Sequence, residues 1–146
     1  MKSKLIKDND EKTFVLIFDT GDEVVSVLMD FAKEHRLKAA QFAGIGACLR
    51  VTLGFFELEQ KDYRKIQINE QVEVMSLLGN ISVTDNGEPK VHGHMVVGKS
   101  DGTAHGGHLL EAHVRPTLEL FLVEYPGQLQ RKMNEQVGLA LIDLTE

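Results

Sequence analysis

The segment VHGHMVVGKSDGTAHGGHLLEAHV, residues 91–114, predicts a β-hairpin and contains five of the six histidines in the chain. β-Forming runs lie on both sides of KSDGT, residues 99–103, where a glycine follows an aspartate as it does in tight hairpin turns. No helix-length connection separates the two runs, so we expect two neighbouring antiparallel strands. Such a pairing would bring histidines of the two strands close together.

The sequence on both sides of this hairpin also has strand character. After Ala39, short apolar or alternating runs follow one another and are separated by turn-like breaks such as TDNGEP, residues 84–89. The absence of helix-length connections in this part of the chain favours a mostly antiparallel sheet. The predicted strands are AAQFAGIGA, LRVTLGFFEL, YRKIQI, QVEVMSLLGNISV, KVHGHMVVG, GHLLEAHV, PTLELFLVEYP and VGLALIDL.

One helix is predicted before these strands. Phe14–Phe18 (FVLIF) is typical of a buried strand, and Thr20 with Glu23 three residues later has the pattern of a helix-capping box. His35 is expected to be a surface residue at the end of the helix, where cations are favoured. We therefore predict an α+β fold in which the sheet packs against one main helix. Apolar residues with helical spacing are Val24, Val25, Leu28, Phe31 and Ala32.

Length and composition are those of one globular domain, residues 1–146, with a core at about 13–144. The net charge of −6 disfavours general binding to nucleic acid, and the short basic clusters Lys61–Lys65 and Arg131–Lys132 are expected to be solvated. The single cysteine, Cys48, excludes a disulfide framework within the chain and is expected to be buried. Neither a signal peptide nor a membrane-length apolar run is present, so we expect a cytoplasmic protein with no membrane partner.

A phosphate-loop pattern overlaps the hairpin but lacks the required context. Gly93–Ser100 (GHMVVGKS) fits G-x-x-x-x-G-K-[ST] by letter. The mechanism needs a flexible loop followed by the N-terminus of a helix. Here the middle residues form strands readily, and a turn follows Ser100. We therefore do not expect a nucleotide site.

His92 and His94 predict a metal site. Side chains alternate along a strand, so these two histidines point to the same side, about 6.6–6.8 Å apart along the strand. Two imidazoles at that spacing can bind one ion. Neutral imidazoles suit zinc, the metal we expect here, and nickel, copper and cobalt also accept this type of ligand. A third ligand from the neighbouring strand would complete a site with an open coordination position.

The register of the hairpin decides which histidine is the third ligand. A two-residue turn places His105 and His113 on the side of His92 and His94. One additional residue, either as a bulge at Gly106–Gly107 or in a three-residue loop, places His108 opposite His94 instead. The residues alone leave both sets open.

Three segments of the chain resemble a known family. VMSLLGNIS, the hairpin with the PTLELFL that follows it, and AAQFAGIGA are similar to the PPC (plant and prokaryote conserved) domain in its prokaryotic single-domain form, over about Thr13 to Leu144. The resemblance implies an α+β fold, a homotrimer, and a metal held by His92, His94 and His108, with His105 and His113 as runners-up.

DNA binding is an alternative, because the family is often described as DNA-binding. Plant members carry an AT-hook with an R-G-R-P core, which this sequence lacks. The plant partner-binding motif Gly-Arg-Phe-Glu-Ile-Leu falls at residues 70–75, which are EQVEVM here. Any DNA binding is therefore expected to be weak, and we rank it second to binding of a metal and a small ligand.

A metal-dependent lyase is the third alternative, because the PPC fold is similar to that of a zinc-dependent acetolactate decarboxylase. Such a reaction needs a proton donor and a group that binds the substrate beside the metal. Glu111, Arg115 and Glu119 are the candidate ligand-binding residues. However, Glu111 shares its strand parity with His113 rather than His108, so we expect it to point away from the metal, and enzyme activity is not favoured.

Overall fold

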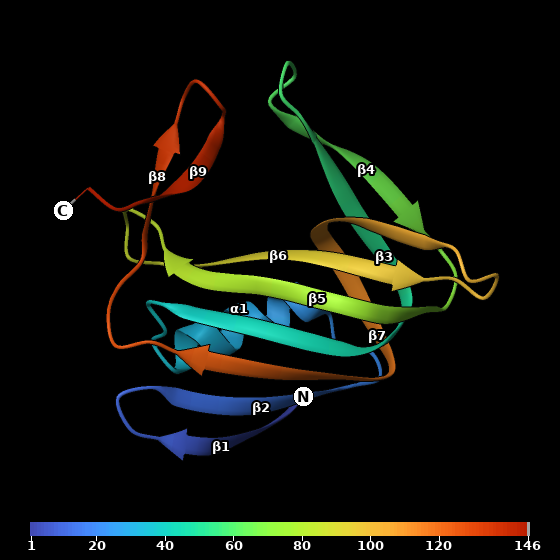
Figure 1. Ribbon diagram of the computed structural model, residues 1–146, viewed down its shortest axis with the longest axis horizontal. Helices are drawn as coiled ribbons and strands as arrows, with labels where there is room; N and C mark the ends of the chain where they lie inside the picture. Colours follow the sequence, from blue (N-terminus) through green and yellow to red (C-terminus); the bar gives the residue numbers. More distant parts are fainter. Residues whose placement is uncertain (146) are drawn as a thin grey trace.

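The computed structural model describes residues 1–145, which form nine strands and one helix (Figure 1). No helix within that range has the length and hydropathy to cross a membrane. The elements are β1 (Lys2–Asp8), β2 (Lys12–Asp19), α1 (Val24–Glu34), β3 (Ala40–Glu57), β4 (Asp62–Ile68), β5 (Val72–Val83), β6 (Pro89–Gly98), β7 (Ala104–Glu124), β8 (Gln130–Asn134) and β9 (Leu139–Asp143).

All nine strands in residues 1–145 belong to one sheet. Its main order is β1-β2-β7-β3-β5-β8-β9, while β4 pairs with β3, and β6 pairs with both β5 and β7. The pairs are antiparallel except for the contact of β5 with β8, which is parallel. The sheet is therefore mixed but mainly antiparallel, and the predicted α+β class is confirmed.

Two of the predicted strand boundaries are wrong. The runs AAQFAGIGA and LRVTLGFFEL form the single strand β3, and GHLLEAHV and PTLELFLVEYP form the single strand β7. Register shifts occur in the pairing of β3 with β5 between Gly44 and Gly46, and in the pairing of β3 with β7 between Gly46 and Cys48. Glycine and proline mark irregularities within long strands here, rather than breaks between strands.

Two strands were not expected from the sequence. β1 is lysine-rich, exposed along its whole length and begins before the range 13–144, and β8 has the polar sequence QRKMN. Neither has the apolar alternation on which strand prediction depends. Both are fixed by pairing with a neighbour, β1 with β2 and β8 with β9.

The helix begins three residues later than the capping box predicts. Glu23 is the N-cap, and its carboxylate accepts hydrogen bonds from the backbone N–H groups of Val25 (3.1 Å) and Ser26 (2.7 Å). Thr20 instead donates a hydrogen bond to the carbonyl of Pro116 (3.0 Å). A turn at Gly21, whose φ is +97°, separates Thr20 from the helix. The other end agrees with the prediction, since His35 is the exposed C-cap.

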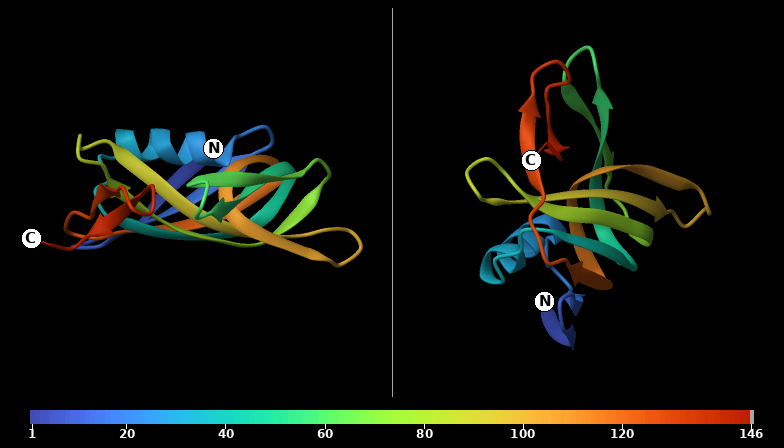
Figure 2. Two further views of the ribbon diagram at one scale, coloured as in Figure 1. Left: turned by 90° about the horizontal axis from the view of Figure 1, so that it is seen from above. Right: turned by 60° about the vertical axis from the view of Figure 1, so that its left-hand side comes forward.

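The hydrophobic core lies between α1 and one face of the sheet (Figure 2). The buried side chains of the helix belong to the same core cluster as those of β2, β3, β5 and β7. Cys48 is fully buried in this cluster, as predicted, and burial raises the pKa of its thiol to about 12. Within residues 1–145, the opposite face of the sheet is not covered by a helix.

Candidate metal centre

The register of the β6–β7 hairpin places His94 directly opposite His108. The ladder is continuous from this pair to Gly98 and Ala104. The bulge proposed at Gly106–Gly107 is therefore wrong, because these glycines pair regularly with Val96 and Met95. The three-residue loop, the other way to reach this register, is the one observed.

That loop consists of Ser100, Asp101 and Gly102. The N–H of Gly102 donates to the carbonyl of Lys99 (2.9 Å), and the N–H of Lys99 donates to the carbonyl of Thr103 (2.9 Å). Gly102 has a φ of +82°, which is costly for other residues. This geometry is the usual three-residue hairpin, in which a residue in the left-handed region follows a turn. It also removes the phosphate-loop interpretation, since the turn leads into a strand.

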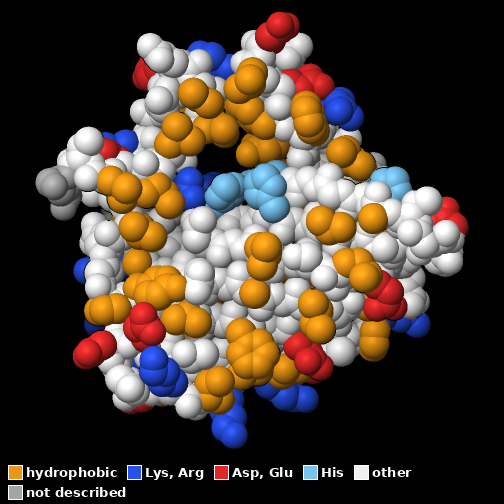
Figure 3. Space-filling model, in the orientation of Figure 1, with side chains coloured by type: hydrophobic (Ala, Val, Ile, Leu, Met, Phe, Trp, Pro, Cys, Tyr) orange, Lys and Arg blue, Asp and Glu red, His pale blue; other side chains and the backbone are white. Residues whose placement is uncertain are grey.

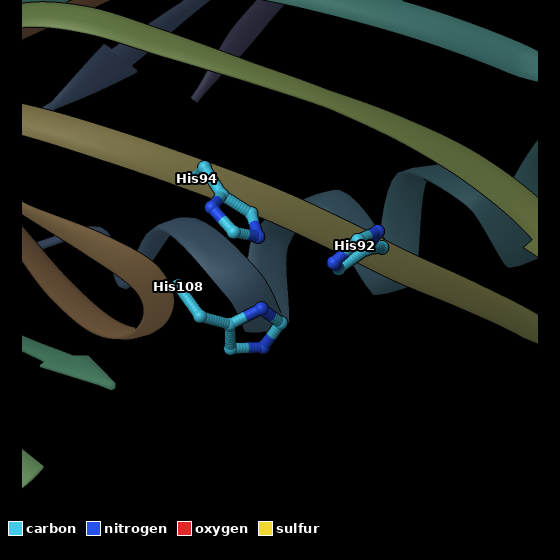
Figure 4. Close-up of side chains that lie close together, drawn as sticks. All are labelled: His92, His94 and His108. Carbon is cyan, nitrogen blue, oxygen red and sulfur yellow. The ribbon is translucent and has the colours of Figure 1, made fainter. Parts of the chain in front are cut away.

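Three imidazole rings converge where the two strands pair (Figure 4). His92 and His94 project from β6, and His108 projects from β7. The ring centroid of His92 lies 5.2 Å from that of His94 and 5.1 Å from that of His108. The ring centroids of His94 and His108 lie 5.5 Å apart. One ligand nitrogen from each ring lies within 4.8 Å of the others. His92 and His108 are half-buried, whereas His94 is exposed.

The remaining hairpin histidines lie elsewhere. His105 pairs with Val97 in the ladder and does not join the cluster. The Nε2 atom of His113 contacts a carboxylate oxygen of Glu111, and it also lies 3.1 Å from a guanidinium nitrogen of Arg50. The structure thus brings together the set implied by the resemblance and not the runners-up.

The three residues suggested to bind a ligand are not brought to the histidine cluster. Glu111 is exposed, and its hydrogen bond to His113 lowers the pKa of its carboxyl. Arg115 is also exposed, in the irregular part of β7. Glu119 lines a separate cavity of about 410 Å³ together with Thr117.

The histidine cluster suits a metal ion. His108 Nδ1 is buried and, within residues 1–145, is the one buried side-chain nitrogen or oxygen without a hydrogen-bond partner. Burial of an unpaired polar atom is costly, and coordination of a cation would satisfy it. Three neutral imidazoles at this separation are the donor set of zinc sites that keep a fourth position open.

The family model of the Plants and Prokaryotes Conserved (PCC) domain matches residues 6–126. The chain belongs to this family. No curated protein matches it in sequence.

Solved structures of similar proteins support this assignment. A plant- and prokaryote-conserved (PPC) protein of Pyrococcus horikoshii is 33% identical, with a TM-score of 0.85 over 99% of this chain and 96% of its own. A metal-containing protein of Archaeoglobus fulgidus is 34% identical, with a TM-score of 0.83 over 97% and 96%. A candidate DNA-binding protein of Bacteroides thetaiotaomicron is 30% identical, with a TM-score of 0.87 over 99% of each chain.

Similarity to the lyase is limited to the fold. The α-acetolactate decarboxylase of Bacillus subtilis is 14% identical, with a TM-score of 0.55 over 90% of this chain and 60% of its own. At this identity the comparison carries no information about chemistry.

In this PCC domain a cavity of about 440 Å³ adjoins His92 and His108. It lies between the β3–β4 hairpin and the β8–β9 hairpin, and Figure 3 shows a hollow there with histidine and basic side chains at its edge. The ring of Tyr63 stacks on His108, with the centroids 4.5 Å apart. The wall formed by β6, β7, β8 and β9 is largely apolar, with side chains of Val91, Leu110, Met133, Leu139 and Leu141.

Arg131 lines the same cavity, a position that the sequence did not predict. It was expected to be solvated but is only 7% exposed. Its side chain donates to Ser82 Oγ (2.7 Å), the carbonyl of Ala140 (2.8 Å) and Asn80 Oδ1 (2.9 Å), and Nη2 lies 3.3 Å from His92 Nδ1. The neighbouring Lys132 is exposed, as expected, and pairs with Asp143.

Burial keeps the cavity histidines neutral. It is the main cause that lowers the pKa of His108 to about 4, and the nearby His92, His94, Lys90 and Arg131 add to the effect. Burial, followed by the charge of Arg131, also lowers the pKa of His92. A metal would therefore not have to displace a proton from His108 at neutral pH.

Metal-free protein is expected to lose stability as pH falls from about 6.5 to about 4. The unfolded chain protonates His108 near pH 6.5, whereas the folded chain does so only near pH 4. In this window the unfolded state binds more protons than the folded state, so the free energy of unfolding decreases as the pH is lowered. Urea denaturation of chelator-treated protein at several pH values measures it. The His108→Gln variant should show a shallower fall, and equal slopes would contradict the assignment.

Proposed function

We propose that this PCC-domain protein binds a divalent metal, zinc in the first instance, through His92, His94 and His108, and holds a small ligand in the adjoining cavity. The observation that carries the proposal is the convergence of the three imidazoles, with one ligand nitrogen from each within 4.8 Å of the others. The Archaeoglobus relative, described as a metal-containing protein, supports it.

The donor set favours a site that binds a ligand rather than one that only stabilises the fold. Structural zinc sites are usually closed by four protein ligands, whereas sites with three leave a position for water or a ligand. The adjoining cavity gives such a ligand access to the metal. A lyase reaction is less well supported, because none of its candidate residues, Glu111, Arg115 and Glu119, lines this cavity.

Elemental analysis of untagged protein tests the proposal. After supply of zinc and dialysis at neutral pH, we expect about one metal ion per chain, held by His92, His94 and His108. The same measurement on protein as isolated identifies the metal. Failure to retain any of zinc, nickel, copper or cobalt would overturn the proposal.

We further propose that copies of this chain associate through the sheet face that points away from α1. Exposed Leu78 (58%) and Phe121 (53%) both pair with Ala43, and Leu78 also pairs with His94, so all four lie on one side of the sheet. Figure 3 shows hydrophobic side chains spread over this face. An apolar sheet face normally requires cover.

A trimer is the assembly expected from the family resemblance, and sedimentation equilibrium tests it. The wild-type protein should be trimeric at micromolar concentration. Phe121→Asp should shift the protein toward monomer, because it places a charge in the buried face. Leu58→Asp, at a position 69% exposed just after β3, is the control and should not. A wild-type monomer would contradict the proposal.

DNA binding is the second candidate, and the description of the Bacteroides relative favours it. The net charge of −6 argues for weak, sequence-independent binding that disappears by about 200 mM salt. Fluorescence anisotropy with a labelled duplex over a range of salt concentrations measures this. Tight, sequence-selective binding at that salt would instead support DNA binding as the main function.

A further inference from the structure

Arg131 is a buried cation whose hydrogen-bond contacts within residues 1–145 are all uncharged. Its side chain is 7% exposed, and it is bonded to a hydroxyl, a carbonyl and an amide oxygen and lies against an imidazole. A buried charge normally has a counter-ion, because removal of a charge from water is costly. The partner missing from these contacts is an anion.

The cavity beside Arg131 has the electrostatic character of an anion site. Apart from the histidines, its lining residues, all within 1–145, include the basic Arg131 and Lys90 and no acidic side chain. A divalent metal on the three histidines would add positive charge at one end. The apolar wall described above suits a hydrocarbon portion of a ligand, and a volume of about 440 Å³ is within the range of small-molecule sites.

Metal binding would also change the hydrogen bonds that Arg131 can make. A guanidinium has five N–H donors, and four of them face the contacts described above. A neutral imidazole accepts at one nitrogen only. If either nitrogen of His92 binds the metal, the other carries the proton, so neither can accept from Arg131. The metal therefore frees a second Arg131 donor.

We propose that this cavity binds a small organic carboxylate with an apolar tail, held between Arg131 and the metal. Two guanidinium donors match the two oxygens of a carboxylate, and such pairs are strong. The tail would lie along Val91, Leu139 and Leu141. This inference rests on the proposed metal site, and it makes carboxylate binding and metal binding mutually favourable.

NMR titration of the zinc-loaded protein with hexanoate, hexanamide and acetate tests the ligand class. Hexanamide has a similar shape without the charge, and acetate has the charge without the tail. Hexanoate should bind at least about tenfold more tightly than either, since it alone makes both the charged contact and the apolar one. Removal of zinc by a chelator should weaken hexanoate binding by a similar factor.

Arg131→Gln should reduce the preference for hexanoate over hexanamide severalfold while the protein retains zinc, because Arg131 is not a metal ligand. If that variant does not fold, Lys90→Gln, at an exposed position, should reduce the preference partially. Wild-type protein that binds zinc but shows no preference for hexanoate would overturn this inference alone. Wild-type protein that binds no zinc would overturn the proposed function as well.

Discussion

His92→Ala and His108→Ala are each expected to remove most of the bound metal. The cluster offers three protein ligands, so loss of one leaves two imidazoles, which is too few for a stable zinc site. The loss of affinity should exceed the roughly 10–100-fold that follows removal of an outer-shell partner. Metal content after dialysis, and affinity by competition with a chelator, measure the effect.

Two matched controls lie on the same hairpin. His105→Ala and His113→Ala should leave metal content nearly unchanged, because His105 lies opposite Val97, and His113 contacts Glu111 and Arg50. Circular dichroism of every variant separates loss of metal from loss of fold. If His105→Ala or His113→Ala removed the metal while His108→Ala did not, the alternative register would be the correct one.

The choice between those registers shows how far the sequence can lead. The letters KSDGT predict a turn, and the H-x-H spacing predicts two imidazoles on one side of a strand. They do not distinguish a two-residue loop from the observed three-residue loop. This one residue decides whether His108, or instead His105 and His113, lies on the same side of the sheet as His94. The family resemblance implies His108 as the third ligand. The three-residue loop is the structural reason that His108 lies opposite His94.

Arg131 could not be found from local sequence. It lies in the polar run QRKMN, and such short charged runs are mostly solvated. Its burial depends on Asn80 and Ser82, which are 51 and 49 residues away in the chain. The strand β8 that carries it is fixed by pairing with β9 rather than by an apolar pattern. Long-range pairing of this kind leaves no periodic signal.

Gly79 shows that backbone packing also positions the site. It pairs with Phe42 on β3 and with Gly93 on β6, between His92 and His94. A Cβ atom at Gly79 would overlap Cζ of Phe42 and the backbone carbonyl oxygen of His92. Phe42 is a core residue, 3% exposed, so its ring cannot move freely into solvent. Because Gly79 has no side chain, β6 can pair closely with β5 at this point, and this pairing positions His92.

Gly79→Ala is therefore expected to destabilise the fold by about 2–3 kcal/mol, as overpacking of a core does, and to weaken metal binding by displacing His92. Gly93→Ala is the matched control, since its Cβ would lie 3.4 Å from Phe42 Cζ, an ordinary contact, and should change stability by less than about 1 kcal/mol. Urea denaturation of both variants measures the difference. The cost of Gly79→Ala should be smaller in a Phe42→Leu background, where the ring atom it meets is gone. Equal stability of the two alanine variants would show that the strands adjust without cost and that Gly79 does not position His92.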